Sequence, residues 1–119
     1  MALPARSPTT QWVKKPNSID IFNLTYEIRW ENKEEHLPDD HYGRCSPAVP
    51  ALVFWMPQSD QHLADSFLHE LIHAINRHHG VDADESMTDE EIATRISSGL
   101  LTIWKQNPRI FRWWLKLLG

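Results

Sequence analysis

Cysteine is almost missing from this sequence, and the single Cys45 excludes a disulfide within the chain. A protein without disulfides fits a reducing compartment, so we predict a cytoplasmic location. The sequence also lacks any apolar stretch of transmembrane length and any hydrophobic N-terminal run typical of a secretory signal peptide. Internal repeats are lacking too, so we expect one ordinary domain rather than a repeat array.

An excess of positive charge is also lacking. The chain has 16 acidic residues against 12 lysines and arginines, which gives a formal net charge of −4. Because phosphate backbones are bound by broad basic surfaces, nucleic acid is not an expected partner. The 119 residues are 41% hydrophobic and 24% charged, which is typical of a single globular domain with a buried core.

The feature with a chemical meaning is the HExxH motif at His69-Glu70-Leu71-Ile72-His73. On an α-helix, residues four apart share a face, so His69 and His73 can present both imidazoles to one metal ion. Glu70 is the adjacent residue and can take a proton from water without being a ligand. The motif predicts a Zn²⁺ site with His69 and His73 as ligands and Glu70 as general base. The other interpretation is a histidine pair on a structural helix that binds no metal.

The residues around the motif predict an amphipathic helix over 59–79, with Ser59 or Asp60 as N-cap and Gly80 as the stop. Its apolar stripe comprises Leu63, Phe67, Leu71, Ala74 and Ile75, flanked by Ala64 and Leu68. Its opposite face comprises His62, Asp65, His69, His73 and Asn76. Histidines and small polar groups in place of lysine and glutamate are what we expect of a helix that lines a cleft.

The rest of the chain predicts an α+β fold with a small mixed sheet of about three strands, a second long helix and a short C-terminal helix. Residues 1–18 carry three prolines and are expected to be an irregular tail, so the domain spans 19–119. The expected elements are one or two strands within 19–31, a polar loop at 32–42, a strand at Ala51–Met56, a turn at 80–87, a helix at 88–106 and a helix at 108–118.

Two histidines do not complete a zinc site, so the third ligand must come from elsewhere. Glu91 is the first candidate, because the loop after the motif can bring a second helix back across the first one. The alternative role of Glu91 is structural, since Thr88-Asp89-Glu90-Glu91 has the form of a capping box. Glu90 and Glu85 are further candidates for the third ligand.

His79 is a rival third ligand. It lies ten residues after His69, as in the extended metzincin motif, although Asn76 stands where that motif has glycine. The structural alternative is that His78 and His79 form a fraying helix end, where a positive charge suits the helix dipole.

The stretches SFLHELIHAI (66–75) and DEEIATRISSGLLTIWKQNP (89–108) resemble the small HExxH proteins of phages and prophages. Those proteins are similar to minimal gluzincin-type zincins, and the likeness covers roughly residues 19–115. The resemblance implies that an acidic residue opening the second helix, here Glu91, is the third ligand. It also implies a zincin-like sheet whose edge strand, here Ala51–Met56, lies beside an extended peptide. The chain lacks an NExxSD-type block around Glu91.

Two other features are given their structural interpretation. Cys45 follows Gly43-Arg44 and is interpreted as an ordinary loop thiol rather than a plug for zinc. The basic and apolar segment 109–118 is expected to pack Trp113 or Trp114 onto the core. The alternatives for this Trp-rich helix are a membrane contact or a subunit contact, such as a homodimer.

These observations predict a zinc-dependent peptidase, located in the cytoplasm of the bacterial host if a phage encodes it. Its partner would be a peptide or protein substrate, and Tyr42, Tyr26 and His78 are the candidates for stabilising an oxyanion. A non-catalytic zinc-binding regulatory protein with the same fold is the alternative from another class. A structural domain without metal is the third possibility.

Overall fold

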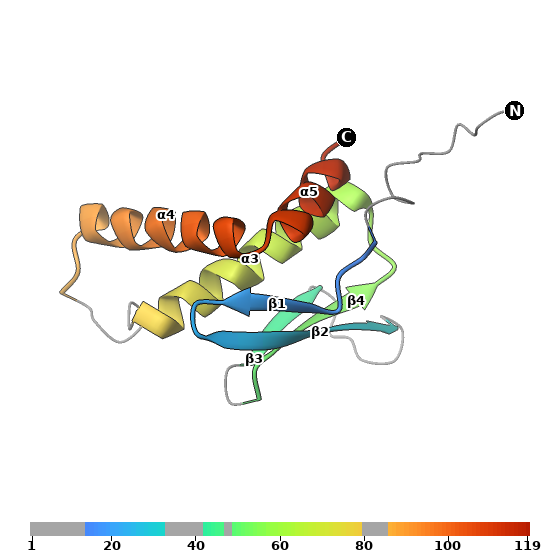
Figure 1. Cartoon of the computed structure of the whole chain (residues 1–119), viewed down its shortest axis with the longest axis horizontal. Helices are drawn as coiled ribbons and strands as arrows, with labels where there is room; N and C mark the ends of the chain where they lie inside the picture. Colours follow the sequence, from blue (N-terminus) through green and yellow to red (C-terminus); the bar gives the residue numbers. More distant parts are fainter. Residues whose placement is uncertain (1–13, 33–41, 47–48, 80–85) are drawn as a thin grey trace, which may run out of the picture.

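The computed structural model describes residues 14–32, 42–46, 49–79 and 86–119. Within these ranges the chain forms a mixed sheet with helices on one side (Figure 1). The elements are β1 (Ser18–Ile21), β2 (Leu24–Asn32), β3 (Gly43–Ser46), β4 (Ala51–Met56), α3 (Asp60–His79), α4 (Asp89–Gln106) and α5 (Pro108–Leu117). The α+β class and the three helices are confirmed. The tail at 1–13, the loop at 33–41 and the turn at 80–85 lie outside the described residues.

Among the described residues the sheet has four strands in the order β1-β2-β4-β3, one more than the expected number of about three. β2 and β4 are parallel, and the other two pairs are antiparallel. The missed strand is β3, a four-residue stretch, Gly-Arg-Cys-Ser, with no apolar alternation. It is a strand because it pairs with β4, with Cys45 opposite Leu52, and not because of its own propensity.

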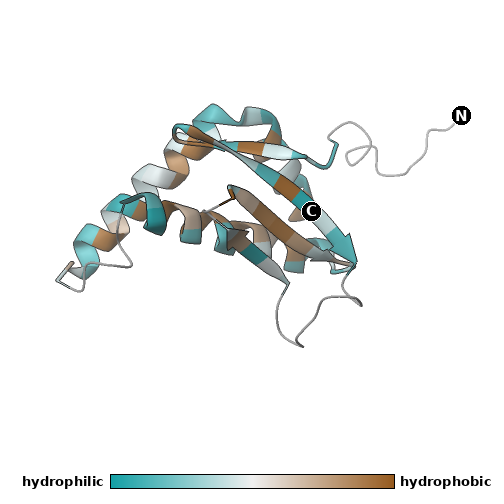
Figure 2. Ribbon diagram, turned by 90° about the horizontal axis from the view of Figure 1, so that it is seen from below, coloured by the Kyte–Doolittle hydropathy of each residue, from teal (hydrophilic) through white to brown (hydrophobic). Residues whose placement is uncertain are grey.

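The implied position of Ala51–Met56 at the sheet edge was also wrong. This strand, β4, lies between β2 and β3, and β3 is the edge strand on that side. The physical reason is that residues 51–55 are all buried, so both faces of β4 are covered. A continuous apolar run suits a central strand, whereas an edge strand tolerates polar residues. Figure 2 shows hydrophobic residues concentrated in the middle of the sheet.

The segment predicted as one or two strands is a hairpin of β1 and β2, joined by Phe22-Asn23. Phe22 has a φ of 58°, a conformation that is strained for a bulky residue. The Gln106 side chain holds both backbone groups of Phe22, accepting from its N–H (3.1 Å) and donating to its carbonyl (2.9 Å). The Phe22 ring also contacts the rings of His78 and His79, so the turn is fixed from two sides.

α3 lies on the sheet by its apolar stripe, as predicted. Ser59 is the N-cap, because its hydroxyl oxygen accepts from the His62 N–H at 3.1 Å. The buried apolar residues of α3 are Leu63, Ala64, Phe67, Leu71, Ala74 and Ile75. They meet the inward side chains of the sheet, where Phe67 stacks on Phe54 with ring centroids 5.2 Å apart. This layer is the core of the domain.

α4 runs antiparallel to α3, packs against it and also contacts β1 (Figure 1). Arg95 donates to the His79 carbonyl at 2.9 Å, and Gly99 lies against Ile75. A Cβ on Gly99 would be 2.8 Å from the Ile75 Cγ2 atom, so only glycine permits this approach of the two helices. The pairs 95–79 and 99–75 define the register of the helices.

α5 returns towards the sheet and buries one of its tryptophans, as expected. Trp113 is 5% exposed and packs edge-on against Phe67, with centroids 5.1 Å apart. Trp114 is half-buried and donates its indole N–H to the Ala64 carbonyl at 2.9 Å. No helix in the described ranges is long and apolar enough to cross a membrane.

A single side chain closes the outer edge of β1. Asn107, at the corner between α4 and α5, accepts from the Asp20 N–H (3.0 Å) and donates to the Asp20 carbonyl (2.7 Å). Its amide nitrogen also donates to the Ile103 carbonyl at 2.8 Å. Asn107 is 8% exposed, so these three bonds replace water for groups that have little access to it.

Replacing Asn107 with alanine should therefore destabilise the fold by about 2–3 kcal/mol, because partly buried partners on Asp20 and Ile103 lose their bonds. Urea unfolding followed by circular dichroism measures this change. Ser97→Ala is the control, since the Ser97 hydroxyl donates to the Thr94 carbonyl of its own helix. A loss for Asn107→Ala no larger than that for Ser97→Ala would contradict the assigned role.

Candidate functional site

The two histidines of the motif meet at their Nε2 atoms, which lie 3.1 Å apart. His69 is exposed and His73 is half-buried, so both rings lie at the surface of α3. Two nitrogens that each bind a tetrahedral zinc at 2.0–2.1 Å are about 3.3 Å apart. The observed separation is close to this value. The separation is compatible with two ligands of one zinc ion and equally with a hydrogen bond between the two rings, so zinc binding by this pair stays a prediction.

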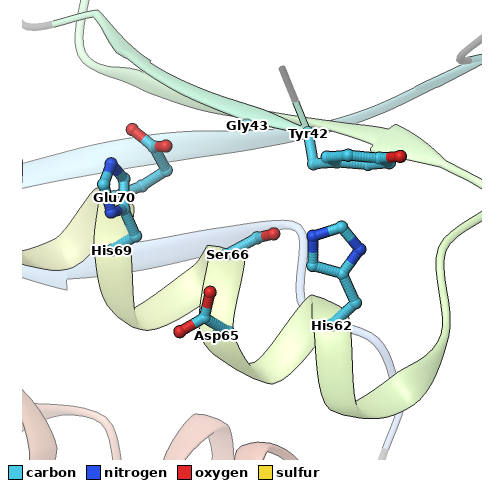
Figure 3. A pocket seen from close by; sticks show the side chains of 7 residues that line it. All are labelled: Tyr42, Gly43, His62, Asp65, Ser66, His69 and Glu70. Atoms are coloured by element: carbon cyan, nitrogen blue, oxygen red, sulfur yellow. The ribbon is translucent and has the colours of Figure 1, made fainter. Parts of the chain in front are cut away.

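Glu70 differs from its neighbours because it is buried, with 5% of its surface exposed. Its side chain points towards β3 (Figure 3). A Cβ added to Gly43 would lie 3.1 Å from both the Cγ and Oε2 atoms of Glu70 and 3.2 Å from the Phe54 ring. The backbone of β3 thus passes directly over the carboxylate, and a side chain at position 43 would press on it. A larger residue at this position would require Glu70 or Phe54 to shift by a few tenths of an ångström.

Two hollows flank the Glu70 carboxylate and share Gly43, His69 and Glu70 in their walls. The first has a volume of about 210 Å³ and is also lined by Tyr42, His62, Asp65 and Ser66 (Figure 3). The second has a volume of about 260 Å³ and is also lined by Arg44, Cys45, His73 and Arg77. Together they form a cleft between α3 and β3, as the polar face of the helix predicted.

The wall of the first hollow is held by Gln58. Its amide nitrogen donates to the Tyr42 carbonyl (3.2 Å), and its amide oxygen accepts from the Ser66 hydroxyl (2.9 Å). The start of β3 is thereby joined to α3. The Tyr42 and His62 rings lie edge to face with centroids 4.1 Å apart, at the end of the hollow away from Glu70. Hydrogen bonds and a ring contact thus hold Tyr42, Ser66 and His62 in the wall of this hollow.

The three candidates for oxyanion stabilisation are not equally placed. Tyr42 lines the first hollow. The Tyr26 hydroxyl and His78 Nε2 are instead 3.1 Å from each other, and Tyr26 is fully buried. Burial raises the pKa of Tyr26 and lowers the pKa of the half-buried His78, so both side chains are neutral near neutral pH. Of the three, Tyr42 is the residue that faces the cleft.

Glu91 takes the structural role that the sequence offered as its alternative. Its carboxylate accepts from the Thr88 N–H at 2.9 Å, and its own N–H donates to the Thr88 hydroxyl at 3.2 Å. This is the predicted capping box at the start of α4. Since Gly99 lies beside Ile75 and a helix rises 1.5 Å per residue, Glu91 and His73 are roughly 15 Å apart along the axes.

The structure therefore brings His69, His73 and Glu70 together and leaves Glu91 apart. In the part of the chain that the structure describes, no three His, Cys, Asp or Glu side chains form a group that could hold a metal. His79 and Glu90 are both exposed and do not join the pair, and Glu85 lies outside the described residues. Glu91 as the third ligand stays a prediction, and it requires the carboxylate to leave its capping box.

The role of β3 in the site was missed at the level of sequence. The sequence led to the interpretation of Cys45 as a loop thiol and to no strand at Gly43, although both belong to the strand that covers Glu70. The sequence did contain an indication of this role, since Gly43 lies shortly before the apolar strand Ala51–Met56. A glycine in a strand often marks a position where another group closely approaches the backbone. Comparison with protein-family models, curated proteins and solved structures found no match, so the likeness to phage-type zincins stays a prediction.

Cys45 is a protonated thiol in this environment. Burial, together with the nearby Glu70 carboxylate, raises its pKa to about 11, although Arg77 acts in the opposite direction. A thiol with this pKa is ionised in about one molecule in a thousand at pH 8. A thiol that is so rarely ionised is a poor nucleophile.

In the metal-free protein, iodoacetamide should thus alkylate Cys45 at least about 100-fold more slowly at pH 8 than it alkylates a free cysteine peptide. Mass spectrometry over time measures the rate. Glu70→Gln should accelerate the reaction, since it removes a charge that raises the pKa of Cys45. Urea-unfolded protein is the control and should react like the peptide. An equal rate for the folded protein and the peptide would refute the assigned environment.

Proposed function

We propose that this protein is a zinc-dependent peptidase with a zincin-like arrangement of its active site. The observation that carries the proposal is the convergence of the His69 and His73 Nε2 atoms at 3.1 Å, beside the buried carboxylate of Glu70. Burying a carboxylate costs free energy because the charge loses its contact with water. A histidine pair with a purely structural role would give no reason for such a burial beside it. The combination supports chemistry at this position rather than a structural role alone.

His69 and His73 would hold the metal through Nε2, and Glu91 is the proposed third ligand. A bound Zn²⁺ would polarise a peptide carbonyl and favour ionisation of a water molecule. Zn²⁺ in proteins is commonly bound by imidazole nitrogens and carboxylate oxygens, and a catalytic zinc site leaves one coordination position for water or substrate. The exposure of His69 leaves the site accessible from solvent.

Glu70 would act as the general base. It would accept the proton of the attacking water on a carboxylate oxygen and later pass that proton to the nitrogen of the leaving amine. Burial beneath β3 suits this task, because the carboxylate is fixed by packing and surrounded by little water. The absence of a side chain on Gly43 leaves the position of Glu70 undistorted.

The substrate would lie along β3. Within the described ranges only β4 pairs with this strand, so its outer edge can take an extended peptide. Such a peptide would run past both hollows. One hollow contains the carboxylate of Asp65, and the other contains the cations Arg44 and Arg77. We infer a preference for basic or polar side chains on one side of the cleaved bond and acidic ones on the other.

A non-catalytic zinc-binding protein is the second candidate, and the capping box of Glu91 is the observation that favours it. If that carboxylate stays in the cap, the two histidines would need another donor to complete a zinc site. A metal analysis does not distinguish the two candidates, whereas hydrolysis of peptides does.

The purified protein supplied with zinc should retain about one zinc per chain, as measured by elemental analysis. His69→Ala and His73→Ala should each remove most of the metal. His62→Ala is the matched control, because His62 lines the same cleft on the same helix but does not take part in the Nε2 pair. Zinc content below about a tenth per chain in the wild type would refute the site.

Glu70→Gln should keep the zinc and the fold but reduce turnover by about 10²–10⁴-fold, because an amide cannot accept the proton. Cleavage of a peptide library that varies charge on both sides of the bond, read by mass spectrometry, measures this. Asp60→Asn, an exposed carboxylate at the start of the same helix, is the control and should stay active. Wild-type turnover in Glu70→Gln would show that the mechanism is wrong.

The two roles of Glu91 can be separated by Glu91→Gln. Glutamine still serves in a capping box, so stability should change by less than about 0.5 kcal/mol. A neutral amide is a poor zinc ligand, so zinc affinity should fall by more than about 100-fold if Glu91 binds the metal. Unchanged zinc affinity in this variant would leave Glu91 with the cap alone and would strengthen the non-catalytic candidate.

A further inference from the structure

The charges of this chain are divided sharply along the sequence. All 16 acidic residues lie before residue 92, and the segment 92–119 contains none. The cations of that segment are Arg95, Lys105, Arg109, Arg112 and Lys116. The overall net charge of −4 therefore conceals a basic C-terminal part joined to a strongly acidic remainder. The basic part is α4 from Ile92 onward together with α5.

Four of these cations form a basic border on the outside of the helix pair. Lys105, Arg109, Arg112 and Lys116 are all exposed. In the part of the chain that the structure describes, none of them takes part in an ion pair. Arg109 and Arg112 are three residues apart, and Arg112 and Lys116 are four apart, so they are neighbours on one side of α5. Like charges so close repel each other and favour an anionic partner.

Next to this border lies an apolar surface, which we call the α4–α5 patch. It comprises Leu101, Trp104, Phe111, Trp114, Leu115 and Leu118. The three leucines are 65%, 45% and 48% exposed in chain order, and among the other leucines that the structure describes only Leu24, at 39%, is exposed. The rings of Trp104, Phe111 and Trp114 lie 4.8–6.5 Å apart, so the aromatic part of the patch is continuous.

The patch cannot turn inward. Ile110, Trp113 and Leu117 already anchor α5 to the core from its other side. Trp114 is held by its hydrogen bond to the Ala64 carbonyl. The leucines therefore stay in water unless a partner covers them, and their exposure is a property of the folded domain rather than of a loose helix.

We propose that the α4–α5 patch and its basic border dock on an anionic membrane surface. Tryptophan, phenylalanine and leucine beside a row of cations match the boundary between acyl chains and acidic headgroups. A second copy fits less well, because a symmetric contact would bring two basic borders together. Nucleic acid fits less well too, because a phosphate backbone offers nothing apolar to the leucines. The proposal is independent of the zinc site.

Sedimentation with vesicles tests the proposal on the full chain without added metal. Vesicles of phosphatidylcholine with about 30 mol % phosphatidylserine should bind the protein, and vesicles of phosphatidylcholine alone should bind it at least about fivefold less. Raising NaCl from about 0.1 M to about 1 M shortens the Debye length from about 10 Å to about 3 Å and should release the protein.

Paired variants separate the two parts of the surface. Leu115→Ser with Leu118→Ser removes apolar area, and Arg112→Gln with Lys116→Gln removes charge; each pair should weaken binding by at least about fivefold. The matched controls are Leu24→Ser and Arg29→Gln on β2, which are exposed but lie outside the patch. The controls should bind like the wild type. Circular dichroism checks that every variant stays folded.

The other outcomes each overturn the proposal. Equal binding to neutral and anionic vesicles would refute the role of the basic border. Self-association that the leucine pair abolishes, without binding to vesicles, would assign the patch to a second copy. Binding to a DNA duplex but not to vesicles would assign the border to nucleic acid. Absence of binding to all of these would leave the patch without the proposed partner.

Discussion

The packing of the α3 stripe on the sheet is the interaction on which the rest of the structure depends. Leu63, Phe67, Leu71 and Ile75 are buried against the inward side chains of β2 and β4. Because successive residues on a helix are 100° apart, this contact also sets the direction of every other side chain of α3. It keeps the two motif histidines out of the core and beside β3. The geometry of the candidate site is thus a consequence of hydrophobic burial elsewhere on the same helix.

The other constraint is the short distance between the β3 backbone and Glu70. A carboxylate with 5% exposure is expensive in an apolar layer, and here it lies between Gly43, Cys45 and the motif histidines. The rise in the pKa of Cys45 is a sign of the same environment, since burial and the Glu70 charge both oppose ionisation of the thiol. The wall of the cleft around Glu70 and Cys45 is thus poorly hydrated, although the cleft itself is open to solvent.

The sequence was most informative where a pattern repeats over many residues. The helix that carries the motif, the antiparallel second helix, the capping box and the burial of Trp113 could all be predicted from spacing and local chemistry. β3 could not, because its four residues have no strand pattern and become a strand by pairing with β4. The strand order is likewise a tertiary property: nothing local to Ala51–Met56 says which neighbours it has. The cap that holds Glu91 was predicted, but the distance from Glu91 to the histidines depends on the contact of Gly99 with Ile75.

The two edges of the described sheet differ in whether they can pair with another strand, and the difference is due to Asn107. Its amide occupies the backbone groups of Asp20, so a foreign strand cannot add at β1 without displacing a buried side chain. Misdirected strand pairing, the first step of many aggregation processes, is thereby confined to the β3 edge. That edge is short and carries Arg44, both of which discourage growth into an extended assembly. Of the two edges of the described sheet, the one at β1 is thus closed against ordered self-association, and the one at β3 is left open.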